Sequence, residues 1–277
     1  MMSAIVVLLA TCNGGKYLAE QIKSLLRQSY SVDIIIKDDG SEDATVGIIE
    51  AYSKQYKNIH FCKDSMTFGT PQGTFNFLLR YAKSFEKYDY FMFCDQDDVW
   101  LEDKVQRSFD QMKILESTHN VGPMMVFSNL FIADENMKIQ HHSMWESEKL
   151  DITIMKNLYK ILALNVVTGS TIMINKKASE VVFPMPLNDV LHDHWIAVNI
   201  VKYGYYSYIE DPLTIYRKHQ KNLVGSTSRG IKYFIRKILH LVRDIRSFKK
   251  KYSHFNFKIS LVKVCFYKVV LNLKRIY

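Results

Sequence analysis

Short apolar runs alternate with amphipathic stretches along the first hundred residues of the chain. The runs are rich in β-branched and aromatic residues and cover 3–10, 32–37, 58–62 and 88–94. Between them, apolar residues recur at helical spacing over 17–29, 44–55 and 73–85. A short continuous apolar run is typical of a strand that is covered on both faces, as in a parallel sheet. The alternation therefore predicts a doubly wound α/β sheet with polar loops at the carboxyl ends of its strands.

The second half of the chain follows a looser pattern. Helical spacing recurs over 104–116 and 192–203, and strand-like runs occupy 124–132, 166–174, 205–209 and 213–217. Because these strands no longer alternate strictly with helices, we expect a mixed sheet that completes the same domain. We therefore predict one body domain, residues 1–228.

Three polar clusters follow predicted buried strands, at 11–13, 38–41 and 95–98. In an open α/β sheet, ligands bind in the crevice beyond the carboxyl ends of the strands, so these clusters mark the expected ligand site. The turn after the first strand is not GxGxxG, and the chain contains no GxxxxGK[ST]. A dinucleotide-binding fingerprint and a P-loop are therefore both excluded.

The densest of these clusters is Asp95-Gln96-Asp97-Asp98. Three carboxylates within four residues repel one another unless a positive group compensates them, and Mg²⁺ or Mn²⁺ binds such groups together with substrate phosphates. The alternative is a solvated acidic turn that caps a helix. Asp38 and Asp39 could accept hydrogen bonds from a base or from sugar hydroxyls, or could form only a turn and a cap.

Two further clusters carry candidate chemistry later in the chain. In His192-Asp193-His194-Trp195, Asp193 could act as a general base, or it could simply cap the helix that begins there. In Tyr216-Arg217-Lys218-His219, the basic groups suit a diphosphate, and His219 could reach a metal or a phosphate. The alternative for this second cluster is ordinary surface charge on a loop.

The net charge of +9 is distributed unevenly along the chain. Residues 229–277 contain 14 of the 37 basic residues and a single acid, Asp244, so this tail carries +13 and the body −4. The hydrophobic content of 48% excludes a largely disordered chain. The four cysteines are widely spaced, which fits a reducing cytosol. We find no run of 18 uncharged residues and no basic segment at the start, so neither a spanning helix nor a secretory signal is expected.

The basic tail, residues 229–277, has apolar residues at helical spacing over 230–248 and again over 258–274. A basic amphipathic helix is typical of a segment that lies on an anionic membrane surface. Two alternatives remain open: a pair of helices packed on the body, or a homodimer formed through the tail. Nucleic-acid binding is not expected, because the body is acidic and the tail contains no recognised binding motif.

Taken together, these motifs resemble those of the inverting family 2 glycosyltransferases with the GT-A fold, a Rossmann-like mixed sheet flanked by helices. Within that family the chain is most similar to the bacterial rhamnosyltransferase-like branch. The similarity extends from residue 4 to about 225 and rests on an ordered set of motifs. These are Ala10-Thr11-Cys12-Asn13-Gly14, Asp38-Asp39-Gly40-Ser41, Gly73-x-x-Asn76-Phe77, Asp95-Gln96-Asp97-Asp98-x-Trp100, Gly169-Ser170, His192-Asp193-x-Trp195 and Tyr216-Arg217-x-His219-x-x-Asn222.

The resemblance implies a role for each matching position. The donor nucleotide-sugar would be bound by Thr11, Asn13, Asp38, Asp39, Asn76, Asp95, Gln96, Asp97 and Arg217. The metal, Mg²⁺ or Mn²⁺, would be held by Asp97, Asp98 and His219. Asp193 would be the catalytic base, with His192 and Trp195 on the acceptor side.

The resemblance also implies a biological setting. The expected reaction transfers a sugar from a dTDP- or UDP-linked donor to a lipid-linked saccharide acceptor, in the synthesis of a bacterial surface polysaccharide such as a capsule. The protein would then be cytoplasmic and peripheral on the inner face of the plasma membrane. Cys12, Ser170 and Lys218 depart from the residues common in the family, which weakens any assignment of the donor sugar. The rival hypotheses are a sugar-nucleotide nucleotidyltransferase and a catalytically inactive membrane-bound scaffold.

Overall fold

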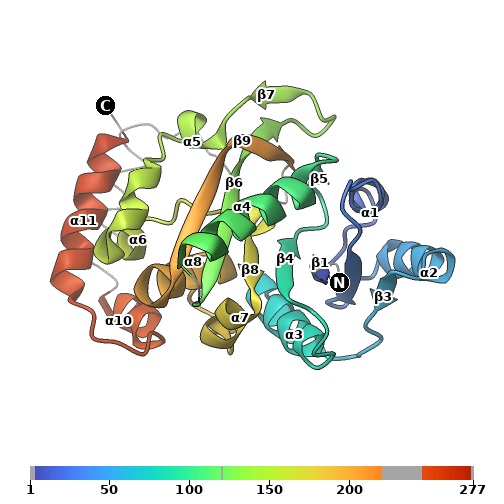
Figure 1. The fold of residues 1–277 in the computed structure, drawn as a ribbon, viewed down its shortest axis with the longest axis horizontal. Coiled ribbons are helices and arrows are strands. Elements are labelled where there is room, and N and C mark those ends of the chain that lie inside the picture. The colour runs from blue at the N-terminus through green and yellow to red at the C-terminus, as the bar shows by residue number, and fades with distance from the viewer. Residues whose placement is uncertain (1–3, 120, 220–244, 276–277) are drawn as a thin grey trace.

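A computed structural model describes residues 4–119, 121–219 and 245–275, and its centre is one mixed β-sheet (Figure 1). The spatial order of its strands is β3-β2-β1-β4-β8-β6-β9-β5, and β7 pairs with the outer part of β6. The first four strands are parallel, whereas β8 runs antiparallel between β4 and β6. The strands are β1 (Ile5–Thr11), β2 (Asp33–Asp38), β3 (Ile59–Phe61), β4 (Tyr90–Cys94), β5 (Val99–Trp100), β6 (Met124–Ala133), β7 (Ile139–His141), β8 (Met173–Asn175) and β9 (Tyr205–Arg217).

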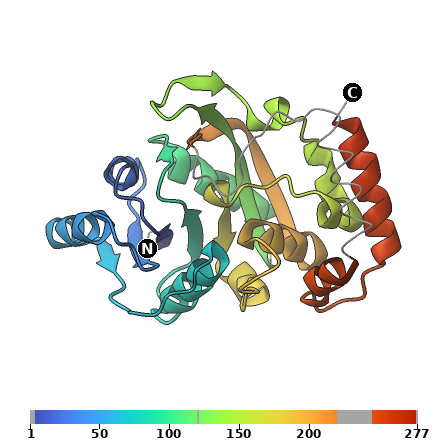
Figure 2. The same cartoon turned by 180° about the vertical axis from the view of Figure 1, so that it is seen from behind.

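Helices cover both faces of the sheet, as the two opposite views show (Figures 1 and 2). Alternate residues of β1 belong to different cores: Val6 and Leu8 pack toward α3 and α8, whereas Val7 and Leu9 pack toward α1 and α4. The α-helices are α1 (Leu18–Leu26), α2 (Thr45–Gln55), α3 (Pro71–Lys83), α4 (Lys104–His119), α5 (Met144–Ser147), α6 (Leu158–Ala163), α7 (Lys176–Val182), α8 (His192–Tyr203), α10 (Ile245–Ser253) and α11 (Leu261–Lys274). Two 3₁₀ turns, η1 (Ile152–Lys156) and η2 (Gly169–Thr171), complete the set.

The alternation predicted for the first half is confirmed to within a few residues at each boundary. Two predictions for the second half are wrong. Only the end of the stretch 166–174 is a strand, because the 3₁₀ turn η2 precedes β8. The stretch 205–217 is one continuous strand rather than two, since β9 accommodates its polar interruption by a shift of register against β6.

The described part of the basic tail packs on the body through one side. Helix α11 lies beside α6 at the end of the molecule opposite α1 and α2 in both views (Figures 1 and 2). Tyr252, Phe255, Val264 and Leu271 are buried in the same core as the sheet. The ring of Phe255 stacks on Trp195 with centroids 4.7 Å apart. Part of the predicted amphipathic stretch, 230–244, lies outside the described residues.

The tail is also tied to the body by polar contacts. The Tyr252 hydroxyl donates to the carbonyl of Leu162 at 2.9 Å, and Arg275 Nε donates to the carbonyl of Glu148 at 2.9 Å. Among the described helices, none combines the length and the apolar character needed to cross a bilayer.

Candidate active site

Asp38, at the end of β2, uses its carboxylate to build the edge of the sheet. Its two oxygens accept four hydrogen bonds: from the hydroxyls of Thr11 and Ser41, and from the backbone N–H groups of Gly40 and Ser41. Gly40 has a φ of +85°, a conformation that side-chain-bearing residues rarely adopt. Asp38 and Thr11 are buried, so this pair holds the first two strand ends together.

Asp39 and Asn13 brace the loops that surround this edge. The carboxylate of Asp39 accepts hydrogen bonds from the backbone N–H groups of Phe68 and Gly69, at 2.6 and 2.8 Å. Asn13, with a φ of 50°, accepts a bond from the backbone N–H of Glu42 through its side-chain oxygen. The structure thus gathers the residues expected around the nucleoside at one place, with their polar atoms already joining three loops.

Gln96 connects the acidic cluster to the end of β1. Its side-chain amide donates to the carbonyl of Cys12 at 2.9 Å and accepts from the N–H of Cys12 at 2.8 Å. A Cβ atom at Gly14 would lie 2.1 Å from Gln96 Oε1, so a larger residue at that position would displace the Gln96 side chain from its present place. This two-way amide bond fixes the loop 95–98 against the turn after β1.

On the other side of the loop, His219 meets Asp97. Its Nε2 lies 2.8 Å from Asp97 Oδ2, and its ring stacks on Tyr17 with centroids 5.1 Å apart. The two side chains are 10% and 16% exposed, so both reach the surface of the site. Asp98, by contrast, is wholly buried, and its Oδ1 accepts a long bond of 3.4 Å from the backbone N–H of Arg217.

The guanidinium of Arg217 is held from several directions. It donates to the carbonyls of Asp97 and Glu135, at 3.0 and 2.8 Å, and pairs with Glu20 at 2.5 Å. It also lies over the ring of Tyr17, 4.6 Å from the ring centre. Only 4% of its side chain is exposed, so in this structure Arg217 orders the walls of the site.

No three or more His, Cys, Asp or Glu side chains converge as a metal-binding group within 4–119, 121–219 and 245–275. Asp97 and His219 nevertheless offer one carboxylate oxygen and one imidazole nitrogen at the same point. Two protein ligands suffice for Mg²⁺ or Mn²⁺ when substrate phosphates and water supply the rest, and a mixed oxygen and nitrogen set suits Mn²⁺. The buried Asp98 is less accessible to an ion than this pair is.

Asp193 lies in the first turn of α8 and carries the signature of a proton acceptor. Burial raises its pKa to about 6, although it accepts hydrogen bonds from its own helix at the N–H of His194, from Gly169 and from Asn165. The charge of Lys251, in the tail helix α10, also lowers this pKa. A partly exposed carboxylate with a pKa near neutrality is suited to general base catalysis.

Asp193 and the acidic loop form one electrostatic unit. Burial, together with the charges of Asp97 and Asp193, raises the pKa of Asp95 to about 7. Burial also raises the pKa of Asp98 well above its usual range, with Asp97 and Asp95 adding to the effect. The carboxylates predicted from separate motifs are therefore neighbours in space.

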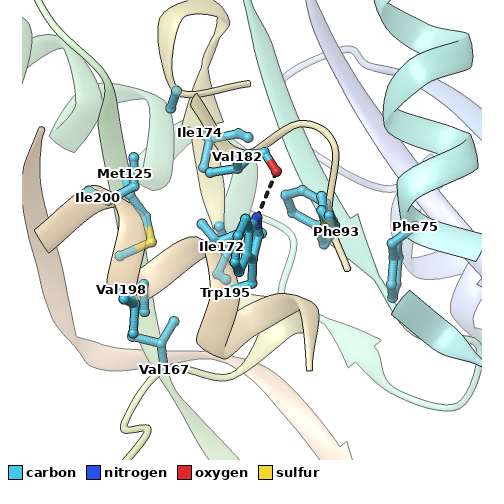
Figure 3. Packing of buried hydrophobic residues seen from close by; sticks show 14 of the residues in the cluster. Phe75, Phe93, Met125, Val167, Ile172, Ile174, Val182, Trp195, Val198 and Ile200 are labelled. Atoms are coloured by element: carbon cyan, nitrogen blue, oxygen red, sulfur yellow. Dashed lines mark hydrogen bonds between the residues drawn. The ribbon is translucent and has the colours of Figure 1, made fainter. Parts of the chain in front are cut away.

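The residues expected on the acceptor side are placed differently. Trp195 points into the hydrophobic core, where its indole nitrogen donates to the carbonyl of Val182 at 2.7 Å (Figure 3). His192 is buried beside Phe75, with ring centroids 4.2 Å apart, and burial lowers its pKa to about 3. Asn76, which was expected at the donor nucleotide-sugar, accepts a bond from the N–H of Met185 and so holds the loop before α8. Trp195 and Asn76 thus serve as supports, and His192 packs behind Asp193.

Sequence reasoning missed several residues of this site. Tyr17, Glu20 and Glu135 surround Arg217, and Lys104 lies buried behind the acidic loop. Glu20 and Glu135 are 197 and 82 residues from Arg217 in the chain, so no local pattern links them. Lys104 opens a helix in the sequence and could have been noticed only as a basic residue on an otherwise buried face.

Comparison with known proteins identifies the family of the chain. Residues 6–183 match the family described as Glycosyl transferase family 2, and the chain belongs to that family. It is 29% identical over 248 residues to the dTDP-rhamnosyl transferase RfbG of Shigella flexneri, covering 85% of this chain and 79% of that protein. It is also 29% identical over 123 residues to glycosyltransferase GlyG of Streptococcus pneumoniae, covering 44% and 39% of the two chains.

Solved structures show the same fold at low identity. The S. aureus TarS fragment 1–349 in complex with UDP-GlcNAc matches with a TM-score of 0.59 and 17% identity, over 98% of this chain and 72% of that one. The mannosyltransferase PcManGT of Pyrobaculum calidifontis, in complex with GDP-Man and Mn²⁺, matches with a TM-score of 0.58 and 14% identity, over 98% and 71%. The fold is therefore that of the GT-A glycosyltransferases, and the protein is a glycosyltransferase.

Proposed function

We propose that the protein is an inverting glycosyltransferase that moves a sugar from a dTDP- or UDP-linked donor to a hydroxyl group of a saccharide acceptor. The observation that carries this proposal is the meeting of Asp193 with the acidic loop, since the charge of Asp193 reaches Asp95. A proton acceptor beside a donor-binding cluster is well placed to deprotonate a hydroxyl that attacks the donor sugar. The rhamnosyltransferase relative supports a deoxyhexose donor.

The proposed reaction is a single displacement. Asp193 takes the proton from the acceptor hydroxyl, and the oxygen attacks C1 of the donor sugar as the bond to the nucleoside diphosphate breaks. Attack from the face opposite the leaving group inverts the configuration at C1. Asp97 and His219 would hold Mg²⁺ or Mn²⁺, which when bound neutralises charge on the departing diphosphate.

A donor screen tests this function directly. The protein is incubated with single nucleotide sugars and Mn²⁺, and release of the nucleoside diphosphate is followed with and without EDTA. We expect slow release from one or a few donors, faster with a suitable acceptor, and loss of both rates on chelation. Pyrophosphate-dependent formation of a nucleotide sugar would instead favour a nucleotidyltransferase, and no turnover with any donor would favour an inactive scaffold.

We further propose that residues 229–277 hold the site against an anionic membrane, where a lipid-linked acceptor for surface polysaccharide would lie. Support comes from α11, which has a second apolar face. Val262, Phe266 and Leu273 recur along one side of this helix and are 80%, 61% and 43% exposed. Residues 245–275 contain nine basic residues and no acid. Two copies would repel each other through such surfaces, so an anionic bilayer fits better than a homodimer.

Vesicle binding tests the membrane proposal. Because α10 and α11 complete the core, point substitutions are preferable to removal of the tail. The triple variant Val262→Ser, Phe266→Ser, Leu273→Ser should bind phosphatidylglycerol vesicles at least about tenfold less, since full burial of each large apolar side chain contributes about 1.5–3 kcal/mol. Ile114→Ser, at an exposed apolar position on α4, is the matched control. Unchanged binding of the triple variant, or concentration-dependent dimers in light scattering that it abolishes, would contradict the proposal.

A further inference from the structure

Lys104, the first residue of α4, is wholly buried, which is rare for a lysine. Its ammonium group donates to the carbonyl of Ser170 and, at 2.5 Å, to the hydroxyl of Thr214. It also lies 3.8 Å from the centre of the Trp100 ring. Within the parts of the chain that the structure describes, no carboxylate lies within ion-pair distance of it.

Such a placement is expensive, because a buried ammonium loses its hydration, and the hydrogen-bond partners that it gains here are both neutral. Burial lowers the pKa of Lys104 to about 7, although the charges of Asp98 and Asp95 oppose that shift. An apolar side chain of similar length would fill the same space at lower cost. General stability therefore does not explain the lysine, and its two oxygen partners suggest another reason.

Each partner of Lys104 belongs to a different half of the site. Ser170 lies in the 3₁₀ turn η2, next to Gly169, whose backbone N–H binds the carboxylate of Asp193. Thr214 lies on β9, three residues before Arg217, whose backbone and guanidinium hold Asp98 and Asp97. The same strand leads to His219, the partner of Asp97. Lys104 thus contacts both the base side and the diphosphate side of the site.

We propose that Lys104 is a positioning residue for glycosyl transfer: its ammonium group fastens the turn η2 to strand β9, so that Asp193 and the Asp97–His219 pair keep a fixed separation. This inference rests on the proposed function, since it concerns the spacing of that reaction. The acceptor hydroxyl sits at the base and the leaving group at the other end. A change of about 1 Å in such spacing costs about 100-fold in rate.

The variant Lys104→Met removes the ammonium and keeps an unbranched side chain of similar length. With the donor found by the screen, we expect kcat for transfer to fall about 100-fold. The KM for the donor should stay within about threefold, because the donor-binding loops retain their own bonds, and the melting temperature should be unchanged or higher. Lys113→Met, on the exposed side of the same helix, is the matched control and should behave as the wild type.

Thr214→Val provides a second, milder test. It removes one acceptor of the ammonium and leaves the shape of β9 unchanged, so kcat should fall several-fold. The double variant Lys104→Met, Thr214→Val should be no slower than Lys104→Met alone, because residues that act through one contact are not additive. Additive losses would show that the two residues act separately and would overturn the proposal.

Amide hydrogen exchange gives a readout that does not depend on activity. In Lys104→Met, peptides covering 165–172 should exchange faster, and peptides covering β1 should exchange as in the wild type. Full transfer activity with unchanged exchange would overturn the inference. If the melting temperature, the donor affinity and kcat all fell together, the role of Lys104 would be only structural, and the inference would also be overturned. If the wild type itself releases no nucleotide from any donor, the proposed function fails. The exchange result still decides whether Lys104 fastens the turn η2 to strand β9.

Discussion

The carboxylates at the edge of the sheet fall into two groups that differ in how their oxygens are bound. Beyond β2, Asp38 accepts four hydrogen bonds, one from Thr11 at the end of β1 and three from Gly40 and Ser41 in the loop that follows Asp38. Beyond β4, Asp98 is wholly buried and Asp95 is partly exposed, and the pKa values of both are raised by burial and by the charges of neighbouring carboxylates. Both carboxylate oxygens of Asp38 are hydrogen-bonded. The ionised forms of Asp95 and Asp98, by contrast, are disfavoured by burial and by nearby negative charge.

This difference separates the carboxylates that stabilise loops from those that are expected to take part in the reaction. A carboxylate whose oxygens are filled by backbone donors fixes a loop and has little capacity left for a ligand. Carboxylates crowded without enough donors favour binding a proton, a cation or a substrate hydroxyl. The first group therefore shapes the site, and the second group, with Asp193, is expected to act in it.

The largest effect is expected from Asp193→Asn. The amide keeps the size of the side chain and cannot accept a proton, so transfer should fall by about 10²–10⁴-fold. The circular dichroism spectrum and donor binding should match those of the wild type, because the first turn of α8 retains its shape. Steady-state transfer rates at saturating donor provide the measurement.

The neighbouring substitution Asp189→Asn supplies the control for this experiment. Asp189 lies four residues away, on the loop before α8, and pairs with Lys250 and His254 of the tail. The variant Asp189→Asn should retain most of the transfer activity. Near-normal transfer by Asp193→Asn would show that Asp193 is not the base. Asp193 would then no longer belong with the carboxylates that are expected to react.

A smaller effect should appear in the pH dependence of kcat. Asp193 works as a base only when ionised, and burial raises its pKa to about 6. Below that pH the rate should therefore fall about tenfold for each unit, as the carboxylate takes up a proton. The residual activity of Asp193→Asn should lack this step. A wild-type profile that stays flat down to pH 5 would show that a different group accepts the proton.

The smallest effect on catalysis is expected from Asp38→Asn, which tests the satisfied group. The amide NH₂ would replace an oxygen that accepts two hydrogen bonds, either from the hydroxyls of Thr11 and Ser41 or from the N–H groups of Gly40 and Ser41. Loss of that acceptor costs about 1–3 kcal/mol in the free energy of unfolding. Urea unfolding measures this loss, with the exposed Asp110→Asn as control. The folded protein should transfer sugar within a few-fold of the wild-type rate. Unchanged stability together with a raised donor KM would show that Asp38 contacts the nucleotide instead.

Much of this arrangement was predictable from the chain alone. Continuous apolar runs such as 3–10 and 88–94 can satisfy their backbones only within a doubly covered sheet, which places the residues after them at one edge. The acidic loop was therefore expected at this edge from a strand end and its residue types, whereas the role of Asp193 as the base comes from the family resemblance and stays a prediction. The proximity of the acidic loop and Asp193 follows from the topology of the fold and is not encoded in any single segment.

Other features could not be read from the sequence, because they depend on contacts distant in the chain. The turn η2 sits inside a β-rich run, where Gly169 approaches His192 so closely that a Cβ would lie 2.2 Å from Nε2. Tertiary packing there overrides the local preference for a strand. Likewise, Trp195 was expected near the acceptor on motif grounds, yet the structure buries its ring against Phe255, 60 residues further on.

That last contact has a consequence for how the protein is made. A chain emerges from the ribosome from its N-terminus, and domains begin to fold as they appear. The sheet and α8 are complete long before Phe255 and α11 arrive to cover the apolar side of Trp195. A chain that is cut short in its last fifty residues would therefore keep all its predicted active-site residues and yet display a sticky apolar face, a target for chaperones and proteases rather than a smaller enzyme.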